Sequence, residues 1–261
     1  MFVYILKIAT NMKKIFLTTA IIASIFTLSI AQDLHFGVQA SPSFSWMSTS
    51  SSKISGSGSA TGLKLGLIVE NRFSQAYSFS TGIGFHFNAG GRLLLDAPSK
   101  FWTDSYDEFE SQPTVKPDSA LFPRDSKFRY SVNYVEIPFG LKLRTPENGT
   151  HLRYFAEPGL TLGFKSGAKG SIIGSGNLDQ EKINITKEVN FFNLSWGIGG
   201  GGEYIISNNT ALVLGLYFQK GFADINKDNG TLYDADGKGN PKKENSKATT
   251  SSLTIRLGVM F

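Results

Sequence analysis

The chain has 261 residues, of which 41% are hydrophobic and none is cysteine. This length suits a single domain with ample apolar surface, and the lack of cysteine excludes disulfide bonds and thiolate metal sites. The formal charge of +5 falls to +2 once Lys7, Lys13 and Lys14 are left out, because they precede the domain proper. So small a surplus, with no basic stripe, argues against a nucleic-acid-binding protein.

The N-terminal segment has the pattern of an export signal. Lys13 and Lys14 precede a long apolar run, and Ser29-Ile30-Ala31 forms a small-x-small cleavage site. A membrane-anchoring helix is the alternative, since the segment is long enough to cross a bilayer. We predict a cleaved signal peptide over 1–31, with its natural start at Met12, followed by one domain over 32–261.

Apolar and polar residues alternate through most of the remaining chain. In one segment Leu63, Leu65 and Leu67 alternate with Lys64 and Gly66. A period of two residues indicates a β-strand with one apolar face. The pattern predicts eight strands, at about 33–46, 60–71, 76–89, 130–145, 151–165, 189–205, 210–222 and 249–261.

The gaps between these strands alternate in length. Short turns at one end and long loops at the other are typical of outer-membrane barrels. We therefore predict an all-β fold, an eight-stranded antiparallel up-and-down transmembrane β-barrel in the outer membrane, with both termini at the short-turn, periplasmic end. The expected short gaps are 72–75, 146–150 and 206–209, and the long ones are 47–59, 90–129, 166–188 and 223–248.

A soluble lipocalin-like barrel or a sandwich is the alternative, because alternation alone does not say which face points outward. The polar faces are rich in glycine and serine, which suits a narrow, filled lumen. Aromatic residues also gather at the strand ends, as in interfacial girdles. Those near the short turns are Tyr77, Tyr154, Tyr204 and Phe261, and those near the long loops are Trp46, Phe87, Phe164 and Phe222.

Three stretches of sequence resemble a known family. They are Tyr134-Val135-Glu136-Ile137-Pro138-Phe139-Gly140-Leu141-Lys142, Tyr154-Phe155-Ala156-Glu157-Pro158-Gly159 and the terminal Leu257-Gly258-Val259-Met260-Phe261. They resemble the outer-membrane β-barrel domain of Bacteroidota, a group that includes PorT-like proteins of gliding and secretion systems. The resemblance spans 32–261 and implies this fold and an outer-membrane location. It carries over no catalytic residue.

Charged residues on the predicted inward faces form the first candidate site. Unpaired charges in a narrow lumen are unfavourable, so we expect them to pair. A salt-bridged plug is the preferred interpretation, because eight strands leave room for little more than side chains. A path for ions or solutes is the alternative. The residues are Lys64, Glu70, Glu136, Lys142, Arg144, Arg153, Glu157, Glu203 and Arg256.

Other motifs point to chemistry less strongly. The three histidines lie on different strands without zinc-type spacing, and no G-x-S-x-G elbow is present, so an outer-membrane hydrolase is a minor alternative. The glycine run 197–202 lacks the helix of a nucleotide-binding loop, and we expect it to allow close packing in the wall. The acids of the last long loop could bind calcium, but we expect the loop to be a solvated connection without a metal site. Its acids are Asp224, Asp228, Asp234 and Asp236.

The loop over 90–129 is the second candidate site. It is longer than a hairpin requires, which favours a function, and it mixes aromatic with acidic residues. We expect it to bind a partner, although its aromatic residues could instead cap the barrel mouth. The candidate residues are Phe101, Trp102, Asp104, Tyr106, Asp107, Glu108 and Phe109.

The resulting functional prediction is a non-enzymatic outer-membrane barrel, a structural or interaction component that could serve a surface, secretion or gliding assembly. A narrow channel and a surface enzyme are the alternatives. The expected partners are outer-membrane lipid, an envelope or secretion-system protein, and the barrel assembly machinery through the terminal strand ending in Phe261. We predict no cofactor, no metal and no nucleic acid.

Overall fold

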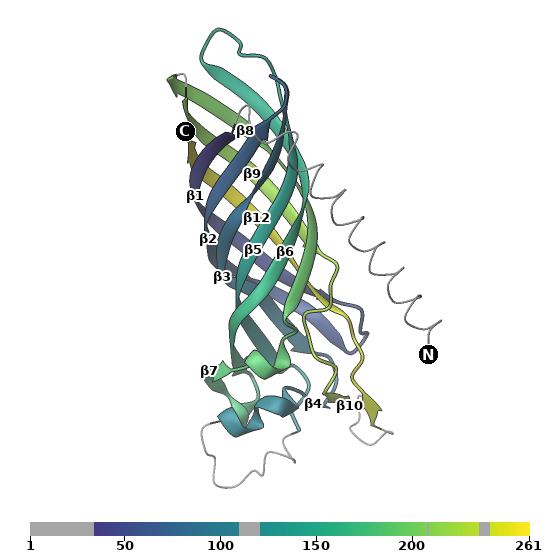
Figure 1. The fold of residues 1–261 in the computed structure, drawn as a ribbon. Coiled ribbons are helices and arrows are strands. Elements are labelled where there is room, and N and C mark those ends of the chain that lie inside the picture. The colour runs from purple at the N-terminus through teal and green to yellow at the C-terminus, as the bar shows by residue number, and fades with distance from the viewer. Residues whose placement is uncertain (1–33, 110–120, 208, 235–240) are drawn as a thin grey trace, which may run out of the picture.

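The computed structural model describes residues 34–109, 121–207, 209–234 and 241–261, so the predicted signal peptide lies outside the described residues. The described part forms a closed antiparallel barrel of eight strands, each paired with its neighbours along the chain (Figure 1). The strands are β1 (Leu34–Thr49), β2 (Ile54–Arg72), β3 (Tyr77–Leu95), β5 (Lys127–Arg144), β6 (Leu152–Ile173), β8 (Phe192–Ser207), β9 (Thr210–Gly221) and β12 (Ala248–Met260).

The pairing of β1 with β12 closes the barrel and confirms the predicted fold class. Phe36 and Phe261 exchange backbone hydrogen bonds of 2.9 and 2.7 Å at this seam. The start of β1 and the C-terminus therefore lie together at the short-turn end, at the top of Figure 1.

The two faces of the wall have opposite character. Large apolar side chains point outward and stay exposed, such as Leu67 at 57% and Leu214 at 59%. Polar and charged side chains such as Ser43, Glu70 and Lys142 are buried inside. A water-soluble barrel would have the reverse arrangement, because so continuous an apolar exterior is stable only against lipid.

The strands β1, β2, β3, β5 and β6 run farther toward the long-loop end than expected, whereas β8 and β9 do not. The gap predicted over 47–59 shrinks to residues 50–53, so it is a tight turn and the prediction of a long loop there was wrong. Bulges in β3 at Asn88 and in β6 near Ser166 interrupt the pairing. Beyond them the pattern is inverted: apolar side chains point inward and polar ones outward.

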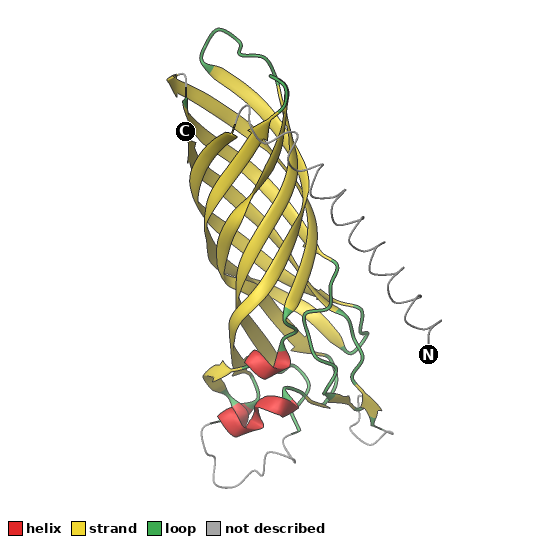
Figure 2. Ribbon diagram, viewed as in Figure 1, coloured by secondary structure: helices red, strands yellow, loops and turns green. Residues whose placement is uncertain are grey.

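Short elements of the long loops cover this end of the barrel, at the bottom of Figure 2. None of the helices in the described ranges is long and apolar enough to cross a membrane. The elements are the strands β4 (Ser99–Lys100), β7 (Gln180–Asn184), β10 (Thr231–Leu232) and β11 (Lys242–Lys243), and the 3-10 helices η1 (Thr103–Glu108), η3 (Gly176–Leu178) and η4 (Thr186–Glu188).

Candidate functional site

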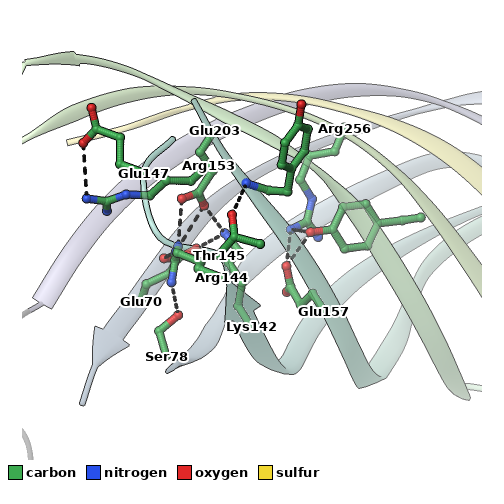
Figure 3. Close-up of polar contacts among 12 residues, drawn as sticks. Glu70, Ser78, Lys142, Arg144, Thr145, Glu147, Arg153, Glu157, Glu203 and Arg256 are labelled. Carbon is green, nitrogen blue, oxygen red and sulfur yellow. Dashed lines mark hydrogen bonds and ion pairs between the residues drawn. The ribbon is translucent and has the colours of Figure 1, made fainter. Parts of the chain in front are cut away.

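A buried group of four charged residues fills the lumen near the short-turn end (Figure 3). We call Glu70, Lys142, Arg144 and Glu203 the inner quartet. Lys142 Nζ donates to Glu203 Oε1 at 3.0 Å and also to Glu70, and Arg144 Nε donates to Glu203 Oε2 at 2.7 Å while its Nη2 donates to Glu70. Arg144 Nη1 reaches Ser78 Oγ at 2.6 Å. Two cations and two carboxylates thus neutralise one another away from water.

A second group lies beside the quartet and combines charge with an aromatic ring. Arg256 Nη1 donates to Glu157 Oε2 at 3.0 Å and to the Tyr217 hydroxyl at 2.6 Å. The Tyr217 hydroxyl in turn donates to Glu157. The guanidinium carbon lies 3.5 Å from the Tyr217 ring centroid, which adds a cation–π contact.

A third group lies nearer the long-loop end. Lys64 Nζ donates to Glu136 Oε2 at 2.9 Å and also to Gln219. His86 Nδ1 lies 3.1 Å from Glu136 Oε1, and His86 Nε2 lies 3.0 Å from Ser43 Oγ. Ser43, His86 and Glu136 thus have the order of a hydrolase triad. However, Ser43 is fully buried and Glu136 is shared with Lys64, so these three side chains form part of the hydrogen-bonded network inside the lumen.

Eight of the nine predicted lumen residues occur in these three groups as four cations and four carboxylates. Arg153 is the exception: it lies at the short-turn mouth, 3.8 Å from Glu147 (Figure 3). The small cavity between the second and third groups has a volume of about 70 Å³, room for only a few water molecules. The three groups are therefore electrically balanced, and the lumen between the second and third groups is almost filled, whereas a cavity of about 330 Å³ lies beside Arg153 and Glu203 at the short-turn mouth.

Aromatic side chains close the long-loop end. Trp102 of the loop after β4 is 1% exposed and packs edge-on against Phe128 and Tyr130 of β5, with ring centroids 4.8 and 5.2 Å apart. Its Nε1 donates to Tyr130 Oη at 2.8 Å. Phe101 and Phe122 also contact the Phe128 ring, at 4.9 and 5.0 Å. We call these packed loops and the strand ends beneath them the cap.

The candidate loop residues divide into two sets in this cap. Phe101, Trp102 and Tyr106 are buried and Phe109 is half-buried, so these aromatic side chains act as core and not as an exposed binding surface. The acids remain outside, and Asp107 pairs with Lys187 at 2.7 Å. A partner would therefore meet the three acids among the candidate residues, Asp104, Asp107 and Glu108, which are exposed.

Other acids of the cap are buried. Glu188 and Glu244 have no exposed surface, and Asn229 Nδ2 donates to Glu188 Oε2 at 2.6 Å. Burial raises the pKa of both carboxyls, and that of Asp224 as well. Asp224 Oδ1 accepts the backbone N–H of Asn226 and of Ala248, each at 3.0 Å, so it holds loop backbone.

The calcium alternative receives no structural support within the described ranges, where no group of three or more acids or histidines could hold a metal. Asp234 instead pairs with Lys53 at 2.7 Å, and Asp236 lies outside the described residues. The glycine run lies in β8, where a Cβ at Gly199 would overlap the Tyr217 ring. Glycine there makes room for the second lumen group.

The sequence matches the model of a protein family described as outer membrane protein beta-barrel domain over residues 30–227. A comparison with curated proteins gives no significant match.

Among solved structures, the chain is similar in fold to three outer-membrane proteins. Neisserial surface protein A is 14% identical, with 88% of this chain and 98% of that one covered and a TM-score of 0.40. Ail, the attachment invasion locus protein of Yersinia pestis, is 10% identical, with 88% of this chain and 100% of that one covered and a TM-score of 0.36. A major outer membrane protein of Thermus thermophilus is 16% identical, with 88% of this chain and 99% of that one covered and a TM-score of 0.42. Likenesses this distant say nothing about what the present chain binds.

Proposed function

Because the chain belongs to the outer membrane protein beta-barrel domain family, whose model matches most of its length, we propose that it is a non-enzymatic, non-conducting barrel that holds an interaction cap at the cell surface. The protein lies in the outer membrane. The observation that supports this function is the closed lumen, in which balanced ion pairs are followed by an aromatic core. A barrel filled in this way serves as a rigid mount for its loops.

The proposal is tested first by conductance in planar lipid bilayers. We expect no steady current from the refolded protein, because the cavity between the second and third lumen groups is only about 70 Å³ and the aromatic core of the cap closes the long-loop end. The double variant Phe101→Ala/Trp102→Ala should also conduct no current, since the three charged groups still fill the lumen on the short-turn side of the cap. Steady single-channel currents from the wild-type protein would put the transport alternative first.

The interaction role is tested at the exposed acids of the cap. We expect Asp104→Asn/Asp107→Asn/Glu108→Gln to lose a captured envelope protein while keeping heat-modifiable gel mobility, since no core side chain changes. The control removes three other exposed acids at the same end, Asp125, Asp179 and Glu181. Equal capture by both triple variants would reject the acids as the binding surface.

The resemblance to PorT-like barrels supports a partner in a surface, secretion or gliding assembly. The terminal strand supports a second partner. It ends in Phe261, which is 54% exposed on the outer face of the seam. We expect the barrel assembly machinery to recognise this strand during insertion.

A further inference from the structure

Four cations lie together on the outer wall of the barrel, between its apolar band and the long-loop end. Arg92 of β3, Lys127 and Arg129 of β5, and Lys169 of β6 all point away from the lumen. Three of them are exposed and Arg129 is half-buried. We call these four residues the basic wall.

The strand register brings the four side chains close together. Arg92 pairs directly with Arg129 across β3 and β5. Lys127 is diagonal to Arg92, because it pairs with Leu94. Lys169 is diagonal to Arg129, because its partner is Ser131. Directly opposed Cβ atoms lie about 5 Å apart and diagonal neighbours about 7–8 Å, so one small anion can contact several of these cations.

Nothing in the described protein neutralises this charge. The four cations of the three lumen groups have carboxylate partners, and so do Lys53 and Lys187 of the loops. No described acid lies within ion-pair distance of any residue of the basic wall. Like charges directly opposite each other destabilise a strand pair. The Arg92 side chain leans away over β2, with Cδ 3.4 Å from the position a Cβ would take at Gly58.

The position of the basic wall indicates what lies beside it. On β5 the outward residues change from Val135 and Ile137 to Asn133, Ser131 and then Arg129. Arg129 lies six residues beyond Val135, about 15 Å along the axis of a tilted strand. Long cationic side chains reach back toward a membrane surface. The basic wall therefore faces sideways into the headgroup layer of the leaflet at the long-loop end.

We propose that the basic wall is a binding site for the phosphate groups of an anionic glycolipid of the outer leaflet. Two arginines offer paired N–H donors that match phosphate oxygens, and the lysines add point charges. A ligand that is anchored in the bilayer meets this wall from the side. At the cap surface, where a soluble polyanion would approach, the exposed lysines are accompanied by the acids of η1, and Lys187 pairs with Asp107.

The test uses the full-length barrel refolded in neutral detergent and titrated with bis-phosphorylated lipid A or with the same lipid stripped of phosphate. We expect binding only of the phosphorylated lipid, weakened by salt. The variant Arg92→Gln/Lys127→Gln/Arg129→Gln/Lys169→Gln should lose at least tenfold in affinity. The matched variant Lys187→Gln/Lys227→Gln/Lys242→Gln/Lys243→Gln removes the same charge from the loops and should bind as wild type.

Three results would overturn the proposal. They are equal binding of the dephosphorylated lipid, equal loss in the two quadruple variants, and binding of soluble heparin in preference to the phosphorylated lipid. Arg129→Lys separates charge from geometry and guards against a folding defect, because it should keep heat-modifiable mobility and bind better than Arg129→Gln. If the lysine and glutamine variants bind equally, phosphate is not recognised at Arg129.

Discussion

Trp102 is held in an unusual backbone conformation. Its φ of 56° and ψ of 45° lie in the left-handed region, which is rare for a bulky residue. The strain is sustained by packing: the ring is buried and lies against Gly170 of β6. A Cβ at position 170 would lie 2.7 Å from Trp102 Cζ3 and closer still to Cη2. Glycine at this position is therefore a condition for closing the cap.

We expect Gly170→Ala to loosen the cap by about 1–3 kcal/mol, the usual effect of overpacking a core. The measurement is a urea titration of Trp102 fluorescence in a background where Trp46 and Trp196 are phenylalanine. Gly167→Ala is the control on the same strand, because a Cβ there meets no atom within 4 Å. Equal destabilisation by both alanines would show that strand flexibility matters and not space for the ring.

The inner quartet depends on complete pairing. Arg144→Met would leave Glu70 and Glu203 with only Lys142 between them. Breaking a buried pair on one side destabilises by about 3–5 kcal/mol. We expect that loss in urea unfolding from lipid vesicles, and partial recovery in Arg144→Met/Glu203→Gln. The exposed Lys187→Met should be indistinguishable from wild type. No recovery in the double variant would mean that packing of the arginine, and not charge balance, matters.

The Ser43 hydroxyl should be unreactive despite its histidine and carboxylate neighbours. It is fully buried inside the barrel, where its oxygen lies 3.0 Å from His86 Nε2. We expect no labelling of the folded protein by a fluorophosphonate probe, followed on gels before and after heat unfolding. Labelling that disappears in Ser43→Ala would make the surface-enzyme alternative the leading one.

At the residue scale, alternation was enough to predict which charges face inward. It also placed Tyr217 and Gln219 on the polar face, but their role as partners of Arg256 and Lys64 depends on the barrel register. The burial of Trp102 could not be predicted, because a loop residue in the left-handed region has no periodicity. Its hydrogen-bond partner Tyr130 is 28 positions farther along the chain, and Asn226, which accepts from the Tyr130 hydroxyl, is 96 positions beyond Tyr130.

At the element scale, two bulges explain why the strands were predicted too short. Asn88 has a φ of 56° and opens the pairing between His86 and Ala89. A bulge shifts the alternation by one residue, so Leu93 and Leu95 point inward although Phe87 points outward. Period-two patterns end at such shifts, and the predicted strands ended there too.

The loops of the cap should weaken as pH rises. Burial raises the pKa of Glu188, Glu244 and Asp224 above the usual values of 4.5 for Glu and 3.8 for Asp. Asp104 acts on Glu188, and Asp228 acts on the other two, in the same direction. The folded cap therefore binds more protons than the open one, and its stability is full below these usual values and falls as the carboxyls ionise.

We expect hydrogen exchange of the loop amides, corrected for intrinsic rates, to show better protection at pH 5 than at pH 8. In Glu188→Gln/Glu244→Gln the difference should shrink, because two of the three carboxyls no longer ionise. An unchanged pH dependence in this variant would place its origin elsewhere.

At the scale of the whole molecule, the barrel consists of two differently patterned halves. The half with the short turns is apolar outside and charged inside, and the half with the long loops is polar outside and apolar inside. The change of the outward residues from apolar to polar marks the edge of the membrane. The lipid-facing part of β3 runs over eleven residues, Tyr77 to Phe87, which matches the 9–11 residues of a membrane-crossing strand.

Single cysteines can locate this edge, because the chain has none of its own. We expect Ser131→Cys to react on intact cells with a membrane-impermeant maleimide and Ile137→Cys to remain unlabelled. Both side chains point outward from β5. Labelling of Ile137→Cys, or protection of Ser131→Cys until the cells are opened, would contradict the membrane position or the orientation.

The filled lumen also limits the order in which the molecule can be built. The polar loops of the cap must cross the bilayer, yet between the second and third lumen groups the finished barrel leaves a cavity of only about 70 Å³. No loop can be threaded through such a space. The loops must cross while the sheet is still open, and the seam between β1 and β12 must form after they have passed. Closure of the ring by the backbone hydrogen bonds of Phe36 and Phe261 then leaves the loops on the far side of the membrane.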